Sequence, residues 1–208
     1  MKTIDALTRL AELRASVFTT NDAAAALRLT RPHASKTLAR LAMARQVLQL
    51  RRGYWGFPDK IDPLMLPAIL TAPAPCYISL QSALYSHGMI SQVPLRIYAV
   101  SSARTQTFST PLGAVSVHHV KPSFFGGFEV NVRTGVAMAT PEKALVDFLY
   151  LSPARSRLFA ALPELELPKG FRRSLALKFT RLIDSSCRRK VVSERLDKLP
   201  HGKLVTKH

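Results

Sequence analysis

The chain has 208 residues, of which 47% are hydrophobic, and it carries 30 basic against 13 acidic residues. This length suffices for one large domain or two small ones, and the apolar content excludes a disordered polybasic tail. A formal charge of +17 favours a polyanionic partner, with nucleic acid ahead of an anionic membrane surface. No apolar stretch is long enough to span a membrane, and the N-terminus lacks the layout of a secretory signal. We therefore expect no membrane partner.

The two cysteines, Cys76 and Cys187, are far apart and have no CxxC spacing. This usage argues against a disulfide scaffold and a zinc site, and it suits a reducing cytoplasm. We therefore expect a cytoplasmic protein that holds no metal.

The basic residues gather at the two ends of the chain. Residues 1–60 contain eleven basic and four acidic residues, and residues 151–208 contain fourteen and five. The middle, residues 61–150, is nearly balanced, with five and four. Two separate basic surfaces are therefore expected.

Residues 1–58 have the pattern of a winged helix-turn-helix DNA-binding domain. Apolar residues recur at spacings of three and four from residue 3 to about 15, and Thr20-Asn21-Asp22 caps a second, short helix. A third helix begins after Thr30, with Pro32 in its first turn, and runs to about residue 45. Strand-like runs over 46–50 and 54–57 then flank a basic turn and predict a β-hairpin.

The third helix is amphipathic, with Ala34, Leu38, Leu41 and Ala42 on its core side. Its polar side would face a major groove, and the hairpin would reach the adjacent minor groove or backbone. The alternative is a solvated basic face. The candidate DNA-binding residues are Thr30, Arg31, His33, Lys36, Thr37 and Arg40 on the helix, and Arg51, Arg52 and Tyr54 on the hairpin.

A proline-rich linker over 59–76 is expected to separate this domain from an α+β domain over 77–200, with a flexible tail over 201–208. In the second domain we expect a helix over 77–88, with Ser79 as its N-cap and Gly88 just beyond its end. Five strand-like runs between residues 95 and 139 predict an antiparallel sheet. Thr140 and Pro141 then begin a helix whose inward residues are Ala144, Leu145, Phe148 and Leu149.

Two basic amphipathic helices are expected near the C-terminus. The first has an apolar face of Phe171, Leu175, Phe179 and Leu182, and the second, over 186–199, buries Val192, Leu196 and Leu199. Their basic faces either form a second nucleic-acid or partner surface or are simply solvated. The residues of this second basic surface are Arg172, Arg173, Arg181, Arg188, Arg189 and Lys190. The fold class is thus α+β, an N-terminal winged helix followed by a small mixed domain with basic C-terminal helices.

No motif indicates catalysis. Glu142 and Asp147 are five residues apart on one helix and share a face poorly, and His118 and His119 point to opposite faces of a strand. No glycine-rich phosphate loop or G-x-S-x-G elbow is present. We therefore expect no enzyme, no catalytic residue, no cofactor and no metal; a metal-dependent nuclease is the weaker alternative.

Three segments of the chain resemble the AbiEi antitoxins of type IV toxin–antitoxin systems: residues 79–84 with 88–90, residues 110–113, and the Ala-Thr-Pro-Glu-Lys-Ala-Leu-Val-Asp segment over 139–147. The resemblance spans about residues 5–152 and includes the Arg-Arg-Gly-Tyr turn at 51–54; no motif after residue 152 matches. It implies an abortive-infection autorepressor that binds double-stranded DNA at inverted repeats upstream of its own operon. It also implies a C-terminal domain that counteracts a nucleotidyltransferase toxin without a stable complex.

One alternative reading is a winged-helix regulator whose α+β domain senses a small molecule. Binding to DNA as a dimer is left open.

Overall fold

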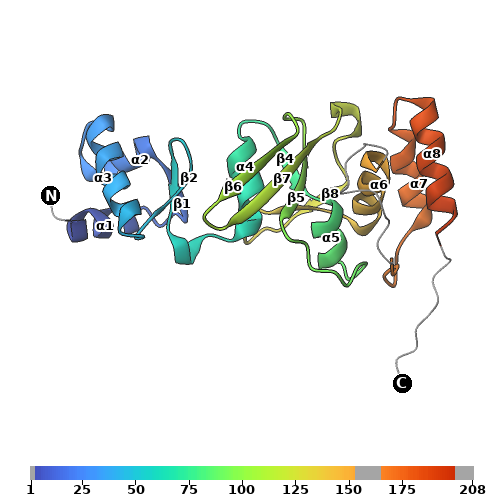
Figure 1. Cartoon of the computed structure of the whole chain (residues 1–208), viewed down its shortest axis with the longest axis horizontal. Coiled ribbons are helices and arrows are strands. Elements are labelled where there is room, and N and C mark those ends of the chain that lie inside the picture. Colours follow the sequence, from blue (N-terminus) through green and yellow to red (C-terminus); the bar gives the residue numbers. More distant parts are fainter. Residues whose placement is uncertain (1–2, 153–164, 200–208) are drawn as a thin grey trace, which may run out of the picture.

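The computed structural model describes residues 3–152 and 165–199 as a mixed α+β protein. The molecule is elongated, with three N-terminal helices at one end, a six-stranded sheet in the middle and two basic helices at the opposite end (Figure 1). Within the described ranges, none of the helices has the length and apolar character needed to cross a bilayer. The predicted tail over 201–208 lies outside the described residues.

The N-terminal unit combines three helices with a small antiparallel sheet in the order β1-β3-β2. Its elements are α1 (Thr3–Ala11), β1 (Val17–Thr19), α2 (Thr20–Leu27), α3 (Arg31–Met43), β2 (Leu48–Arg51) and β3 (Tyr54–Gly56). Strand β1 was not predicted, because three residues are too few to show an alternating pattern; it forms by pairing with β3. The helices close on a core that includes Leu10, Leu27, Leu38 and Trp55.

Helix α2 begins with a capping box one residue earlier than expected. The Thr19 hydroxyl accepts the Asp22 N–H at 3.2 Å, and the Asp22 carboxylate accepts the Thr19 N–H at 2.7 Å. Thr20 is buried instead, and its hydroxyl accepts a hydrogen bond from the Trp55 indole N–H at 2.9 Å. This bond fixes α2 against the hairpin β2–β3.

The segment expected as a linker is folded. It contains the 3₁₀ turns η1 (Pro58–Lys60) and η2 (Pro63–Met65) and helix α4 (Leu66–Thr71). Its apolar side chains join residues of β2 and of the large sheet in a shared cluster, here called the bridging core: Leu50, Ile61, Leu66, Leu70, Val115 and Val117. The prolines therefore shape short turns that pack, and the hairpin β2–β3 is held against the sheet.

The large sheet has the order β6-β7-β5-β4-β9-β8. Its strands are β4 (Cys76–Ile78), β5 (Ile97–Ser101), β6 (Gln106–Thr110), β7 (Gly113–His119), β8 (Phe128–Val130) and β9 (Ala137–Ala139). The prediction of an antiparallel sheet is wrong for two pairs, β5–β7 and β4–β9, which run parallel. Strand β7 pairs with the edge strand β6 in an antiparallel hairpin, and it is β7, not β6, that lies beside β5. Strand β7 therefore runs parallel to β5.

Helix α5 (Leu80–Ser86) ends as the sequence predicts. Gly88 adopts a φ of 66°, and the Met89 N–H donates to the Leu84 carbonyl at 2.8 Å. Ser79 is the N-cap residue of α5, as predicted, but the Ser79 hydroxyl makes no bond to the helix and donates to Asp147 instead. Residues 77–78, expected as helix, and Cys76, expected as the end of the linker, form β4 instead.

Helix α6 (Pro141–Leu151) begins as predicted, with the Thr140 hydroxyl accepting the Lys143 N–H at 3.3 Å. The expected inward residues are all buried: Ala144, Leu145, Phe148 and Leu149. Helices α7 (Arg173–Arg181) and α8 (Ser186–Asp197) pack on α6, which places α6 between them and the rest of the domain (Figure 1).

The buried face of α7 differs from the prediction. Leu182 is 44% exposed, whereas Ala176, Thr180 and Ile183 are buried. The helix begins only at Arg173, so Phe171 precedes it and the expected three- and four-residue spacing does not describe one helical face. In α8, Val192 and Leu196 are buried as expected.

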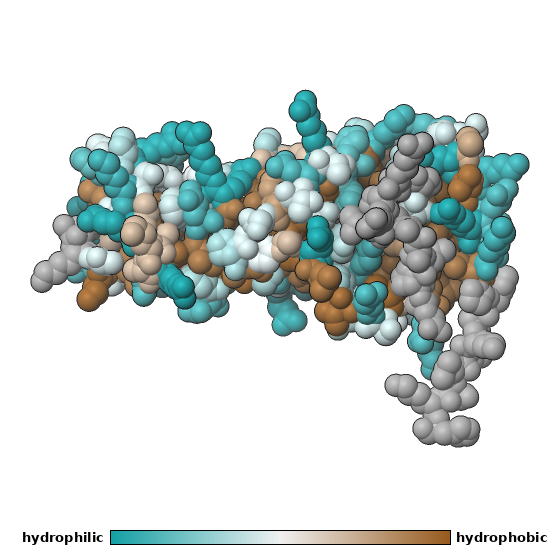
Figure 2. Space-filling view, viewed as in Figure 1, coloured by the Kyte–Doolittle hydropathy of each residue, from teal (hydrophilic) through white to brown (hydrophobic). Residues whose placement is uncertain are grey.

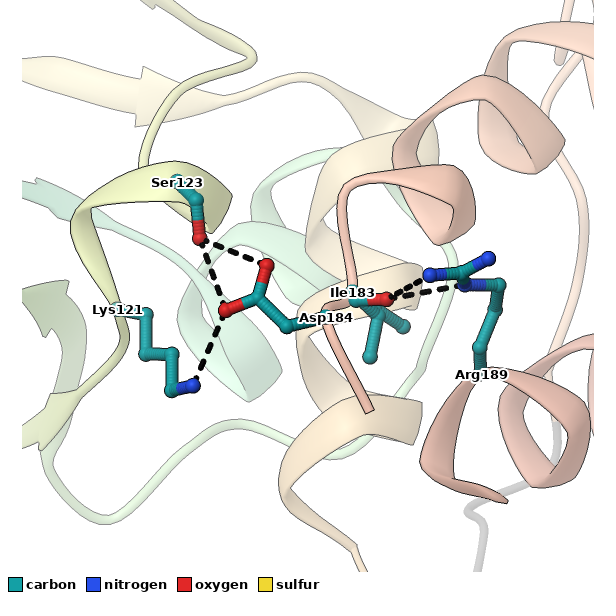
Figure 3. A network of polar contacts seen from close by, with 5 residues as sticks. All are labelled: Lys121, Ser123, Ile183, Asp184 and Arg189. Carbon is teal, nitrogen blue, oxygen red and sulfur yellow. Dashed lines mark hydrogen bonds and ion pairs between the residues drawn. The ribbon is translucent and has the colours of Figure 1, made fainter. Parts of the chain in front are cut away.

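A polar network holds the turn between α7 and α8 against η3 (Pro122–Phe124), as Figure 3 shows. The Asp184 carboxylate pairs with the Lys121 ammonium at 3.0 Å and accepts the Ser123 hydroxyl at 3.3 Å. From the other side, the Arg189 guanidinium donates to the Ile183 carbonyl at 2.7 Å. Lys121 also holds the pKa of Asp184 below its usual value, through a hydrogen bond and its charge.

Candidate nucleic-acid interface

The outer surface of α3 is open to solvent along the length of the helix. Ala34, Leu38 and Leu41 are fully buried, which fixes the opposite side of the helix toward solvent. The residues on that side are exposed: Pro32, Ser35, Lys36, Ala39 and Met43. Small side chains therefore lie along the middle of the face, with long basic side chains beside them. Hydrophilic side chains cover much of this end of the molecule in Figure 2.

Most of the helical candidates predicted from the sequence are exposed. Arg31, His33, Lys36 and Arg40 are all open to solvent, and His33 Nδ1 shares a hydrogen bond with the Thr30 hydroxyl at 3.2 Å. This bond orients the His33 ring at the start of the helix.

The prediction that Thr37 contacts DNA is wrong. Thr37 is buried at 8% exposure, and its hydroxyl donates to the His33 carbonyl at 3.0 Å. It lies too close to the core side of α3 to reach a groove, since Ala34, Leu38 and Leu41 flank it on the helical surface.

The two hairpin arginines have different environments. Arg52 is exposed in the turn, where Gly53 adopts a φ of 83°. Arg51 is half-buried, and its guanidinium donates to the Leu70 carbonyl at 3.3 Å and the Ala72 carbonyl at 3.1 Å. It also lies 4.0 Å from the centre of the Tyr54 ring. The placement of Arg51 at the tip is therefore wrong: it ties the hairpin to the end of α4.

Sequence reasoning missed four exposed residues near this face. Ser35 and Ala39 lie on the outer side of α3, and the positions of the buried residues would have placed them there on a helical wheel. Arg28 and Arg45 follow α2 and α3 with left-handed φ values of 53° and 56°, and both are exposed. No sequence pattern predicts that an arginine will adopt a left-handed backbone conformation, so only the structure shows where these two side chains lie.

Five of the six residues of the predicted second basic surface make contacts within the protein. Arg172 pairs with Glu142 at 3.5 Å, and Arg189 is held as described above. Arg173 donates to the carbonyls of Leu196 and Leu199 at the end of α8. Arg188 lies 4.9 Å from the centre of the Tyr150 ring, and Lys190 lies 4.0 Å from the Glu194 carboxylate; both are exposed, as is Arg181.

The segment over 139–147 contains a buried polar cluster rather than a site open to a ligand. Lys143 and Asp147 are 0% exposed and their Nζ and Oδ1 atoms lie 2.5 Å apart. The Asp147 carboxylate also accepts the Ser79 hydroxyl at 2.7 Å and the Tyr77 hydroxyl at 3.0 Å. The Lys143 ammonium lies 3.5 Å from the centre of the Phe124 ring. This cluster joins α6 to β4 and to the start of α5.

Burial disfavours the charged forms of Lys143 and Asp147. It raises the pKa of Asp147 and lowers the pKa of Lys143, although their mutual attraction and hydrogen bond oppose both changes. Burial likewise raises the pKa of the Tyr77 hydroxyl, and the nearby Asp147 charge adds to the effect. The pattern of Lys and Asp four residues apart is common on exposed helix surfaces, so the sequence alone did not mark it as buried.

The two neighbouring histidines of β7 point to opposite faces, as predicted. His118 is buried, which lowers its pKa, and shares a 3.0 Å hydrogen bond with the Ser116 hydroxyl, whereas His119 is exposed. Across residues 3–152 and 165–199, no three His, Cys, Asp or Glu side chains gather in a way that could hold a metal ion.

The exposed face of α3 and the exposed Arg52 of the β2–β3 turn are thus the candidate site of the basic N-terminal unit. No protein-family model matches this chain, and no curated protein matches its sequence.

Proposed function

We propose that this protein is a transcriptional regulator that binds duplex DNA through a winged helix-turn-helix. In this proposal α3 enters the major groove and the β2–β3 turn contacts the adjacent backbone or minor groove. The observation that carries it is the exposed outer face of α3, on which Lys36 and Arg40 flank small side chains. The order of helices and strands, α1-β1-α2-α3-β2-β3, supports the same arrangement.

The chemistry of this face suits a groove. Lys36 and Arg40 can neutralise phosphates or pair with guanine, and the small Ser35 and Ala39 allow the helix to approach base edges closely. An alanine methyl group can contact the thymine methyl, and a serine hydroxyl can bond either kind of base edge. Thr37 and Arg51 have structural roles instead, since both are bonded within the protein.

We further propose, from the resemblance of residues 79–84, 110–113 and 139–147, that the protein is an autoregulatory antitoxin. It would repress its own operon at inverted repeats and counteract a nucleotidyltransferase toxin without a stable complex. Two of these three segments meet in the buried cluster around Asp147, which gives them a shared structural reason.

The DNA-binding proposal is tested by replacing Lys36 and Arg40 together with alanine. Each lost phosphate contact lowers the slope of log affinity against log salt by about 0.9, so the double variant should lose about 1.8. Binding to a labelled duplex from the protein's own upstream region, followed by fluorescence anisotropy, measures the slope. Raising the salt from about 50 to 200 mM should then weaken the variant about 12-fold less than the wild type.

The matched control is Arg104→Ala with Arg133→Ala, which removes two exposed basic residues far along the chain from α3. This control should keep the wild-type slope. An unchanged slope in the α3 variant would refute the orientation of α3. Co-expression with the adjacent gene tests the antitoxin role, since loss of rescue when that gene is induced contradicts it.

A further inference from the structure

A cavity of about 640 Å³ lies between the β8–β9 hairpin, the start of α6, the segment before α7, and η2. This volume is within the range of small-molecule sites. Much of its wall is apolar, from Leu64, Val136, Met138 and Phe171. The cavity is separate from the face of α3 and plays no part in the contacts proposed with DNA.

The charges on the cavity wall favour a cation. Glu142 is buried and already satisfied, since it accepts the Arg172 N–H at 2.9 Å and pairs with the Arg172 guanidinium. Although burial raises its pKa, these contacts hold the pKa of Glu142 below its usual value. With that pair neutral, the described residues that line the cavity carry two further carboxylates, Asp62 and Glu129, against one ammonium, Lys169. In a chain with 30 basic residues, a wall with an excess of carboxylate stands out.

His87 adds an acceptor to the same wall. Its Nε2 donates to the Ala139 carbonyl at 2.7 Å, because a carbonyl can only accept. In the neutral ring the other nitrogen, Nδ1, is therefore an acceptor. His87 and Glu129 both line the cavity, and an ammonium group, which has only donors, suits acceptors of this kind.

The cavity is also lined by residues of the segment that follows the hairpin β2–β3. Asp62 and Leu64 line it, and they lie between Ile61 and Leu66, which belong to the bridging core with Leu50 of β2. A molecule in the cavity that displaces η2 therefore acts on side chains packed against the hairpin.

We propose that this cavity binds a small organic cation in which a protonated amine is joined to an apolar group, and that its binding changes the affinity of the protein for DNA. The second half rests on the proposed function, whereas the first does not.

The binding test uses the full chain, labelled at the methionine methyl groups, and phenethylamine as the probe. The NMR signal of Met138, which lines the cavity, should shift and saturate below about 10 mM amine. The signal of Met43, exposed on α3, should stay in place. Phenethyl alcohol and 3-phenylpropionate, which replace the charge or reverse it, should bind at least about 10-fold more weakly.

Two variants test the role of charge. Glu129→Gln should weaken amine binding about 5-fold or more, whereas Glu194→Gln, which removes an exposed carboxylate on α8, should not. The site is refuted by any of three results: no saturable shift at Met138, equal binding of the alcohol, or an unchanged affinity in Glu129→Gln. Tighter binding of the carboxylate probe would equally overturn the assignment to a cation.

The regulatory half is tested by measuring DNA affinity with phenethylamine and with an equal concentration of sodium chloride. The amine should change the affinity at least about threefold in the wild type, and Glu129→Gln should need about 5-fold more amine, or more, for the same change. If the amine binds and DNA affinity stays the same, the regulatory half is overturned. If the protein binds no DNA at all, the proposed function fails, while the NMR titration still decides the site.

Discussion

Replacing Asp147 with asparagine tests the buried cluster most directly. The substitution keeps the shape of the side chain and removes its charge, so the Lys143 ammonium loses its ionic partner while remaining fully buried. The hydroxyls of Tyr77 and Ser79, which both donate to Oδ2, can still donate to the asparagine oxygen. The amide NH2 group then faces Lys143, so the ammonium loses its hydrogen-bond acceptor together with its ionic partner.

The expected cost follows from the burial of the pair. Removing one partner of a buried ion pair costs about 3–5 kcal/mol, because an uncompensated charge remains in an apolar environment. For a protein of this size, that loss lowers the melting temperature by roughly 6–20 °C. Removing the second charge as well, in Lys143→Met with Asp147→Asn, should restore at least about 2 kcal/mol of this loss.

Urea denaturation measures these differences with two signals. Circular dichroism reports all helices, and the fluorescence of Trp55, the only tryptophan, reports the N-terminal unit. The dichroism transition should move to lower urea in Asp147→Asn and move back in the double variant. A cost below about 1 kcal/mol for Asp147→Asn, or a double variant no more stable than the single one, would refute the role of charge in this cluster.

Two further changes test close packing and a buried histidine. A Cβ atom on Gly127, whose φ is +73°, would lie 2.7 Å from the Phe179 ring and 2.9 Å from Lys143 Cγ, so Gly127→Ala should cost about 2–4 kcal/mol in urea denaturation. Gly135→Ala, at a similar φ but with open space around it, should cost only about 1 kcal/mol, and equal costs would show that the ring yields. Burial lowers the pKa of His118, so its contribution to stability is complete above its unfolded pKa of 6.5 and is lost as the pH falls below it. The free energy of unfolding should fall by up to about 1.4 kcal/mol per pH unit below that value, and more steeply than in His118→Gln; parallel pH profiles would mean that the folded ring takes up a proton as easily as the unfolded one.

The elements that the sequence predicted well are those specified by neighbouring residues. The start of α3 follows from Pro32 in its first turn, the end of α5 from Gly88, and the start of α6 from the Thr140 cap, each within a few residues of the helix end. The β6–β7 hairpin likewise follows from the turn at 111–112. Local chemistry determines these features, so a single sequence reveals them.

The features that were missed depend on contacts between distant residues. Strands β1 and β4 have three residues each and exist through their pairing partners. Arg51 lies in a basic turn sequence, which is typical of an exposed hairpin tip. Its guanidinium instead donates to carbonyls at the end of α4, which keeps it half-buried. In the candidate interface the sequence gives the helix and its charge, whereas the exact rotation of α3, which buries Thr37 and exposes Ser35, comes from packing.

The cluster around Asp147 also bears on the order in which the chain folds. Its hydrogen bonds to Tyr77 and Ser79 join residues 70 and 68 positions apart, whereas the Trp55–Thr20 bond of the N-terminal unit closes 35 positions. Longer loops cost more entropy to close, and contacts between distant residues slow folding. During synthesis the N-terminal unit is complete before α6 has been made. The contacts that join β4 and the start of α5 to α6 can form only after Lys143 and Asp147 have been synthesised. The hairpin β2–β3 thus offers Leu50 as a ready surface on which the later sheet can assemble.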